Sequence, residues 1–185
     1  MEWHATGSLI AEPAHGHPEL LAGPVVRALA ALDPAIAAQV GVAAIDPALA
    51  DTSEFCARYD VGLDVSANCV VIKGKRGGDV RYAACMVLAT SRADVNGVVR
   101  RRLDARTASF APMDEAVALT GMEYGGITPL GLPADWPILV DAAVARAAEV
   151  VIGSGIRGSK IFLPGSALAA LPYAEVIEDL SRAIE

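Results

Sequence analysis

Cys69-Val-Val-Ile-Lys73 and Arg81-Tyr-Ala-Ala-Cys-Met-Val-Leu88 are two apolar runs, separated by the polar, glycine-rich segment Gly74-Lys-Arg-Gly-Gly-Asp79. Runs of this composition favour strands, and the segment between them is typical of a hairpin turn. A short turn of this kind joins antiparallel strands. Because helices and strands alternate through the rest of the chain, we expect a mixed sheet in an α+β domain rather than a doubly wound parallel sheet.

The segments on both sides of the hairpin predict short elements. Apolar residues at helical spacing in Pro18–Leu32 predict a helix whose first turn lies at Pro24, and Asp51 with Glu54 resembles a capping box that opens another helix. Gly121–Pro137 has no periodicity and predicts a long loop. Further helices are expected over 95–103, over 112–121, after Asp141 and after Pro164, and further strands over 40–45, 109–111, 138–141, 150–152 and 161–163.

The composition is that of one folded domain. The chain has 185 residues, of which 54% are hydrophobic, 20% charged and 5% aromatic, so a core built mainly from Ala, Val, Leu and Ile is expected. No apolar run approaches the ~20 residues that span a bilayer, and Met1–His4 lacks the features of a secretory leader. Three widely spaced cysteines are expected to be reduced and mostly buried. We therefore expect a cytoplasmic protein without a membrane partner.

The charge is unevenly distributed. The net charge is −7, yet residues 73–160 carry twelve basic against nine acidic residues, whereas residues 1–72 carry two against nine. A local basic surface can contact phosphates even in an acidic protein, because phosphate contacts are local. Solvated faces of a hairpin and a helix would give the same pattern. The charges therefore permit a polyanionic partner without requiring one.

Several common sites are not supported by the sequence. Gly153-Ser-Gly155-Ile-Arg-Gly158 matches G-x-G-x-x-G, but a dinucleotide site needs a helix to begin inside the motif, and Ser159–Leu163 predicts a strand instead. The three histidines lie within the first 17 residues, with no nucleophile elbow and no metal-ligand spacing. We expect no metal and no cofactor.

Gly125-Gly-Ile-Thr-Pro129-Leu-Gly-Leu-Pro133 predicts a stiff loop with an accessible backbone. Glycines permit close approach and unusual dihedral angles, and prolines restrict the chain around them. Such a loop can direct N–H groups at a carbonyl or a developing oxyanion, although a purely structural turn has the same composition. Any enzymatic activity is therefore expected to depend on positioning and backbone electrostatics rather than on a side-chain nucleophile.

The order and spacing of several motifs resemble those of the YbaK/prolyl-tRNA-synthetase-associated editing-domain family. These motifs are Ala108–Ala116 with Thr120-Gly121, Gly125–Gly131, Leu139-Val-Asp141 and Gly153–Gly158. The resemblance covers about residues 60–175, and the first ~55 residues match poorly. We treat 1–185 as a single domain, with an atypical N-terminal region at 1–55 and an editing-like core at 56–185. The resemblance implies a curved, barrel-like mixed β-sheet flanked by helices.

The resemblance also implies trans-editing, the hydrolysis of the ester that joins a wrong, small amino acid to a tRNA, often the tRNA for proline. Water would attack the ester with help from the terminal hydroxyl of the tRNA and without a metal. The implied partner is tRNA, and a synthetase is a candidate further partner. The sequence does not decide between a monomer and a homodimer. The motifs would place Gly125, Gly126 and Asp141 at the catalytic centre. Candidate substrate contacts are Asn68, Ser109, Ile127, Thr128, Pro129, Ser154, Gly155, Arg157 and Gly158, and candidate contacts to the tRNA backbone are Lys73, Lys75 and Arg76.

One departure from the family bears on activity. Typical members carry a lysine where this chain has Asn68, and Lys73 and Lys75 lie too far along a strand to replace it. Asparagine can donate and accept hydrogen bonds but brings no charge. Three hypotheses stay open: a deacylase of mischarged tRNA, a catalytically impaired module that binds an aminoacyl-adenosine end or a small metabolite, and a hydrolase of another small ester or amide. Asp141 can equally cap the next helix, and Arg157 can be a turn charge.

Overall fold

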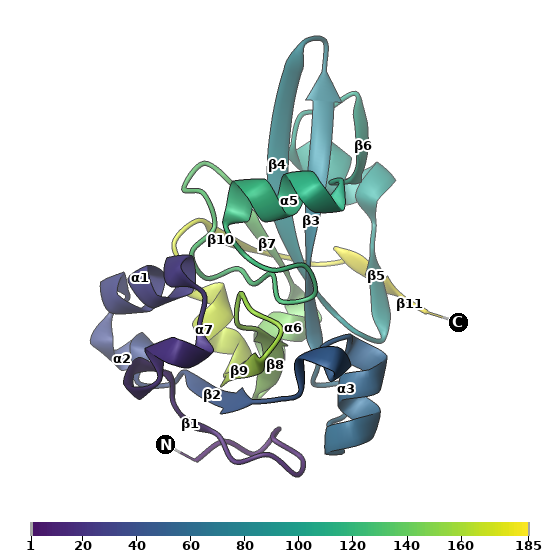
Figure 1. Cartoon of the computed structure of the whole chain (residues 1–185). Helices are drawn as coiled ribbons and strands as arrows, with labels where there is room; N and C mark the ends of the chain where they lie inside the picture. Colours follow the sequence, from purple (N-terminus) through teal and green to yellow (C-terminus); the bar gives the residue numbers. More distant parts are fainter. Residues whose placement is uncertain (1, 185) are drawn as a thin grey trace.

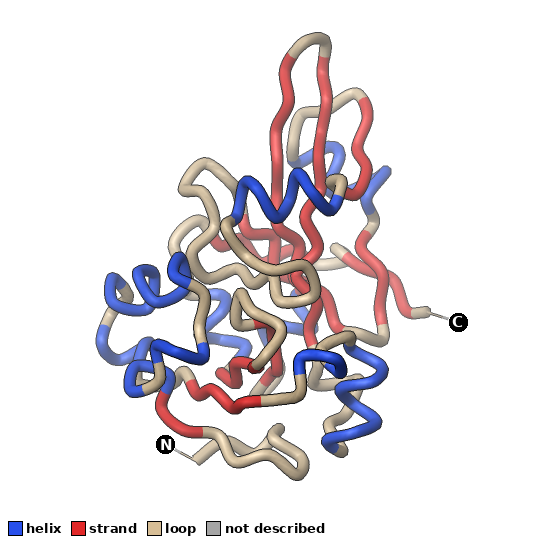
Figure 2. The backbone as a smooth tube through the Cα atoms, viewed as in Figure 1, coloured by secondary structure: helices blue, strands red, loops and turns tan. Residues whose placement is uncertain are grey.

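The computed structural model describes residues 2–184, which form three β-sheets and a set of short helices (Figures 1 and 2). The strands are β1 (Glu12–Pro13), β2 (Gly41–Ala44), β3 (Ala67–Arg76), β4 (Asp79–Leu88), β5 (Ser91–Ala93), β6 (Thr107–Phe110), β7 (Ile138–Asp141), β8 (Val150–Gly153), β9 (Ser159–Leu163), β10 (Ala174–Ile177) and β11 (Ser181–Ala183). The α-helices are α1 (Gly23–Ala31), α2 (Pro34–Ala37), α3 (Thr52–Tyr59), α4 (Arg100–Arg102), α5 (Met113–Thr120), α6 (Ala142–Arg146) and α7 (Gly165–Ala169). Single 3-10 turns lie at Ala14–Gly16, Pro18–Leu20 and Pro47–Leu49, and a π-helical turn at Val95–Val99 leads into α4. Across residues 2–184, no helix is long and apolar enough to cross a membrane.

The central sheet has the strand order β10-β7-β4-β3-β6. β3 and β4 pair antiparallel over their whole length, from Ala67 opposite Leu88 to Arg76 opposite Asp79. β7 runs parallel to both β4 and β10, whereas β6 runs antiparallel to β3. This arrangement confirms the expected mixed sheet. The tip of the β3–β4 hairpin extends beyond the rest of the molecule (Figure 1).

The second sheet is antiparallel throughout, with the order β1-β2-β9-β8, and the third pairs β11 with β5. The two larger sheets approach each other at the start of β3, where Ser66 forms a parallel bridge with Val151 of β8. The amide of Val151 donates to the carbonyl of Val65 at 2.8 Å. Within the described residues the sheets curve around this junction without closing into a barrel.

The N-terminal region belongs to the core. β2 lies between β1 and β9, so this region supplies an internal strand of the second sheet. Trp3 packs flat against Gly41, where a Cβ atom would lie only 2.5 Å from the indole ring. Phe55 of α3 and Phe162 of β9 are buried in the same apolar cluster as Trp3. The fold therefore depends on residues 2–55 as well as on the region that carries the family motifs.

Candidate functional site

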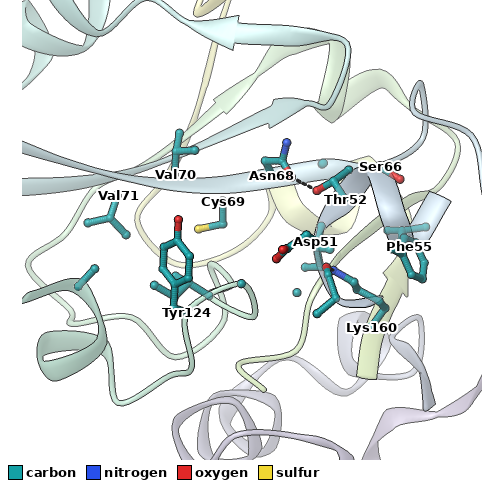
Figure 3. A pocket seen from close by; sticks show the side chains of 18 of the residues that line it. Asp51, Thr52, Phe55, Ser66, Asn68, Cys69, Val70, Val71, Tyr124 and Lys160 are labelled. Carbon is teal, nitrogen blue, oxygen red and sulfur yellow. Dashed lines mark hydrogen bonds between the residues drawn. The ribbon is translucent and has the colours of Figure 1, made fainter. Parts of the chain in front are cut away.

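A pocket of about 360 Å³ lies at the junction of the two larger sheets. Its walls come from the N-terminal end of α3, the first half of β3, the start of α5, the loop at Tyr124–Ile127, and strands β8 and β9 (Figure 3). The volume falls in the range of small-molecule sites. Much of the wall is apolar, including Cys69, Val71 and Ile127, and a few polar groups interrupt it.

The Gly125–Pro129 loop is held against the turn between β8 and β9. The amide of Gly155 donates to the carbonyl of Gly126 at 2.7 Å, and a Cβ atom on Gly126 would lie 2.6 Å from the carbonyl oxygen of Ile156. Gly125 has φ +83°, a left-handed conformation that L side chains rarely adopt, and a Cβ atom there would collide with Arg157. The glycines are therefore required by close contact between two loops.

Arg157 ties this turn to three other segments. Its backbone amide donates to the Glu123 carboxylate at 2.6 Å, and its Nε donates to the carbonyl of Pro47 at 3.0 Å. Its Nη1 donates to the Tyr124 carbonyl at 3.3 Å and to Asp51 Oδ1 at 3.1 Å. A planar guanidinium suits this multiple role because its five donors have fixed directions. Arg157 thus positions the loops that form the mouth of the pocket.

Asn68 borders the pocket, but its side chain is already engaged. Thr52 Oγ1 donates to Asn68 Oδ1 at 2.8 Å, which joins the start of β3 to the start of α3. Figure 3 shows the Asn68 amide on the opposite side of the strand from the Cys69 side chain. Successive side chains on a strand point to opposite faces, so Cys69 and Val71 face the cavity and Asn68 lies at its rim.

Lys160 of β9 brings a positive charge into the pocket. The residue is only 8% exposed, and its Nζ donates to the carbonyl of Ala50 at 2.8 Å and lies 5.0 Å from the centre of the Phe55 ring. Burial lowers the pKa of this ammonium to about 8, with a smaller lowering from Arg157, while Cys56 and Asp51 act in the opposite direction. The group is therefore mainly protonated at neutral pH.

The thiol in the pocket is not activated. Burial raises the pKa of Cys69 far above its ordinary value, and the nearby Cys85 adds to the effect. Burial also raises the pKa of Cys85 to about 12. Because the thiolate is the reactive form, both cysteines behave as small apolar side chains at neutral pH.

The structure places the predicted substrate contacts at different depths. Asn68, Gly125 and Ile127 line the pocket, and Gly126 and Gly155 lie in closely packed loops outside its lining. Gly158 is also outside the lining and is not closely packed, since no atom lies nearer than 3.8 Å to a Cβ built there. Four other predicted contacts lie away from the pocket. Ser154 is buried and hydrogen-bonded to Ser159, and Thr128 is buried with no partner for its hydroxyl within residues 2–184. Pro129 borders a separate groove, and Ser109 is exposed on β6.

Asp141 lies outside the pocket, although the motifs were expected to place it at the catalytic centre with Gly125 and Gly126. Its Oδ1 accepts a hydrogen bond from the amide of Ala143 at 2.8 Å and so caps α6, while its Oδ2 accepts from both the amide and the hydroxyl of Ser181, at 2.9 and 2.7 Å.

The alternation of side chains along β7 explains this placement. Leu139, two residues before Asp141, packs with Ile72 and Leu180. Ile138 and Val140 pack into the cluster on the other face of the sheet. The alternation of side chains thus directs Asp141 away from the cavity.

The predicted basic contacts are also not equivalent. Lys73 Nζ is held by both oxygens of Glu115, at 2.6 and 2.8 Å, and the Tyr82 hydroxyl donates to the same carboxylate. Arg76 pairs with Asp104 at 3.1 Å on the surface, and Lys75 is exposed on the hairpin. Lys75 lies seven residues beyond Asn68, about 23 Å along the strand. These charges lie along the hairpin, away from the floor of the pocket.

Sequence reasoning missed Lys160, Asp51 and the aromatic residues at the mouth, Tyr124 and Phe110, which are 57% and 62% exposed. One signal was available in the sequence, because Lys160 directly precedes the apolar run Ile161–Leu163 and belongs to the same strand. Lysine is rarely buried without a partner or a function. The predicted capping box marks the start of α3 correctly, but its side-chain bond is not formed: Asp51 stands at the N-cap and makes no capping bond.

Comparison with known proteins gives a family match and a set of similar folds. The family model described as an aminoacyl-tRNA editing domain matches residues 46–171. A crystal structure of a protein proposed to be a trans-editing enzyme for prolyl-tRNA synthetase has a TM-score of 0.69 at 21% identity, covering 85% of this chain and 97% of that one. A hypothetical protein gives 0.70 at 20% identity, covering 80% and 95%. A Marinobacter aquaeolei VT8 protein proposed to act in signal transduction gives 0.54 at 17% identity, covering 85% of this chain and 30% of that one. At these identities the similarity establishes a shared fold, and the curated proteins contain no match.

Proposed function

The chain belongs to the aminoacyl-tRNA editing domain family, and we propose that it is a trans-acting deacylase that hydrolyses the ester of a small, wrongly attached amino acid on tRNA, with tRNA for proline as the first candidate. The observation that carries the proposal is the pocket itself. It combines the Gly125 loop, a buried lysine and a small apolar wall with a mouth open to a longer substrate.

The pocket residues favour water as the nucleophile. The hydroxyl of Thr52 donates to Asn68, and the hydroxyl of Ser66 donates to the carbonyl of Gly62 at 3.0 Å. No histidine is among the described residues that line the pocket, and Cys69 is protonated. Water would add to the ester carbonyl, the bond from the carbonyl carbon to the ribose oxygen would break, and the ribose oxygen would take up a proton.

The apolar wall would select a small side chain. Cys69, Val71, Ala111, Ala116 and Ile127 line the cavity with small and medium-sized apolar side chains, which suit a small acyl side chain. A missing methylene changes binding by only ~1–3 kcal/mol, so exclusion of larger side chains by shape is the stronger device. Cysteine, alanine, serine and threonine are therefore the amino acids to test.

The mouth of the pocket suits the end of a nucleic acid strand. Tyr124, Phe110 and Met113 line it and are all more than half exposed. Exposed aromatic rings provide stacking surfaces for unpaired bases, and each stacked base contributes ~1–3 kcal/mol. Lys75 and Arg76, on the projecting hairpin, are candidate contacts for the tRNA backbone, and a synthetase is a candidate further partner. A tRNA substrate is consistent with an expected cytoplasmic location.

The impaired binding module stays as the alternative, because the Oδ1 of Asn68 is occupied by Thr52 and the residue brings no charge. A deacylation assay with tRNAs carrying Cys, Ala, Ser or Thr separates the two. We expect turnover by the wild type, and a loss of at least ~100-fold in Gly125→Ala, because the new Cβ would displace Arg157 and strain the backbone.

Gly78→Ala is the matched control, since no atom lies within 4 Å of a Cβ built at that hairpin position. Gly78→Ala is expected to retain wild-type turnover. No turnover by the wild type, with activity appearing in Asn68→Lys, would favour the binding module. Inactivity of both would exclude these substrates and direct attention to other small esters or amides. A gel shift at rising salt concentration tests RNA binding separately, because phosphate contacts weaken steeply with salt.

A further inference from the structure

We propose that Lys160 and Asp51 form a matched pair of contacts for an aminoacyl group, in which the Lys160 ammonium donates to the ester carbonyl oxygen and the Asp51 carboxylate accepts from the α-ammonium group. The inference rests on the proposed function and names the residues by which the pocket would recognise the acyl part of its substrate. Among the described residues that line the pocket, these two carry the only formal charges.

Lys160 has donors to spare in a place where a charge is costly. An ammonium group has three N–H donors, and one of them is used by the carbonyl of Ala50. Within residues 2–184 no carboxylate forms a salt bridge with Nζ, so the charge is solvated by one carbonyl and the face of Phe55. A lysine that served only to fill space would be replaced at lower cost by an apolar chain. The remaining donors are available to a carbonyl oxygen in the cavity.

Asp51 also has an unused acceptor at the cavity. An N-cap aspartate usually accepts a backbone amide of its own helix, but the Asp51 side chain makes no such bond. Arg157 binds Oδ1, and no hydrogen bond to Oδ2 occurs within the described part of the chain. Figure 3 shows the Asp51 carboxylate directed into the pocket, which Lys160 also lines.

The two charges match the chemistry of an aminoacyl ester. Such an ester carries an α-ammonium group on the carbon next to its carbonyl, so one acidic and one basic side chain that line the same pocket can hold both groups. During hydrolysis, the oxygen of water bonds to the carbonyl carbon and the carbonyl electron pair moves onto the oxygen. That oxyanion would lie against Lys160, whose interaction with it is stronger than with the neutral carbonyl.

The test compares two stable analogues, 3′-alanylamino-3′-deoxyadenosine and its 3′-propionylamino counterpart, which lacks only the α-amino group. Binding to the wild type, Lys160→Met and Asp51→Asn is measured by calorimetry at pH 7. We expect the wild type to prefer the alanyl analogue by at least ~10-fold, as is usual for a hydrogen bond between charged groups. Asp51→Asn should lose that preference, and Lys160→Met should bind both analogues more weakly than the wild type does, by a similar factor for each.

Arg182→Gln and Asp79→Asn are matched controls on the exposed surface, away from the pocket, and should bind both analogues as the wild type does. Retention of the preference in Asp51→Asn, wild-type binding in Lys160→Met, or failure of the wild type to bind either analogue would overturn the inference. Binding with the expected pattern but no turnover of mischarged tRNA would leave the inference standing and refute the deacylase.

A kinetic readout separates catalysis by Lys160 from a purely structural role. In an active enzyme, kcat/KM of the wild type should fall as pH rises above about 8, where Lys160 deprotonates. The titratable and charged groups that face Lys160 are the Cys56 thiol, the Asp51 carboxylate and the Arg157 guanidinium. Lys160→Arg stays charged, so its profile should lack this fall, while titration of the substrate amine affects both proteins alike. Identical profiles would rule out a charged role for Lys160. Lys160→Met should lower kcat by ~100-fold or more.

Discussion

Replacement of Asp141 by alanine tests whether this carboxylate supports the fold or the chemistry. The residue is buried and accepts three hydrogen bonds, one from Ala143 and two from Ser181. Loss of a helix cap costs ~1 kcal/mol, and a buried amide left without its acceptor costs ~1–3 kcal/mol. We therefore expect Asp141→Ala to lower the free energy of unfolding by about 3 kcal/mol. In a chain of this size such a loss lowers Tm by ~6–12 °C.

Urea denaturation measures the loss, and deacylation at a temperature where the variant is folded measures the chemistry. Asp33→Ala is the matched control, because Asp33 caps α2 through a similar bond to Ala35 at 2.8 Å but is exposed and lacks contacts like those to Ser181. It should lose only ~1 kcal/mol. An Asp141→Ala protein as stable as the wild type but inactive would refute the structural role assigned here and return Asp141 to the catalytic centre.

Three further results are expected. Burial lowers the pKa of Lys160 from 10.5 to about 8, so the unfolded chain binds more protons than the folded one between these pH values. The free energy of unfolding of the wild type should therefore rise relative to that of Lys160→Met from pH 8 to 10.5, by about 3 kcal/mol at most, and urea midpoints that run parallel across that range would contradict this. Thr128→Val should raise stability by ~1 kcal/mol, since it removes a buried hydroxyl that has no partner in residues 2–184, and a loss measured by urea denaturation would reveal a hidden partner. Tyr124→Ala should weaken binding of the adenosine analogues by ~5- to 150-fold. Tyr173, which is also more than half exposed but lies outside the pocket, provides the control, and Tyr173→Ala should leave the affinity measured by calorimetry unchanged.

The local structure of this chain follows closely from its sequence. The β3–β4 hairpin, the helix that begins after Pro112 and ends at Gly121, and the turn between β8 and β9 occur where the residues predict them. Each is determined by neighbouring residues: glycines with positive φ at Gly77 and Gly121, and a proline before the first turn of α5. The Gly153–Gly158 motif joins two antiparallel strands and opens no helix, as predicted.

The contacts between distant segments did not follow from the sequence. The region 1–55, expected to be atypical, supplies β2 beside β9 and the aromatic residues Trp3 and Phe55 of the core. Lys73 was expected to face a phosphate, but it pairs with Glu115, 42 residues away. Spacing along the chain cannot predict such pairs, because they depend on which strands become neighbours and on which face each side chain occupies.

Asn68 and Lys160 illustrate the same limit in the candidate site. The family resemblance implies a lysine at the position of Asn68, and from the sequence its loss suggested impaired chemistry. Position 68 and position 160 border one pocket, although 92 residues separate them in the chain, because the start of β3 meets β8 and β9 at the sheet junction. An electrostatic contribution depends on where a charge lies in space, and not on the strand that carries it. In the proposed deacylase, Lys160 would therefore supply from the same cavity the charge that position 68 lacks. The impaired binding module stays as the alternative, and turnover by the wild type separates the two.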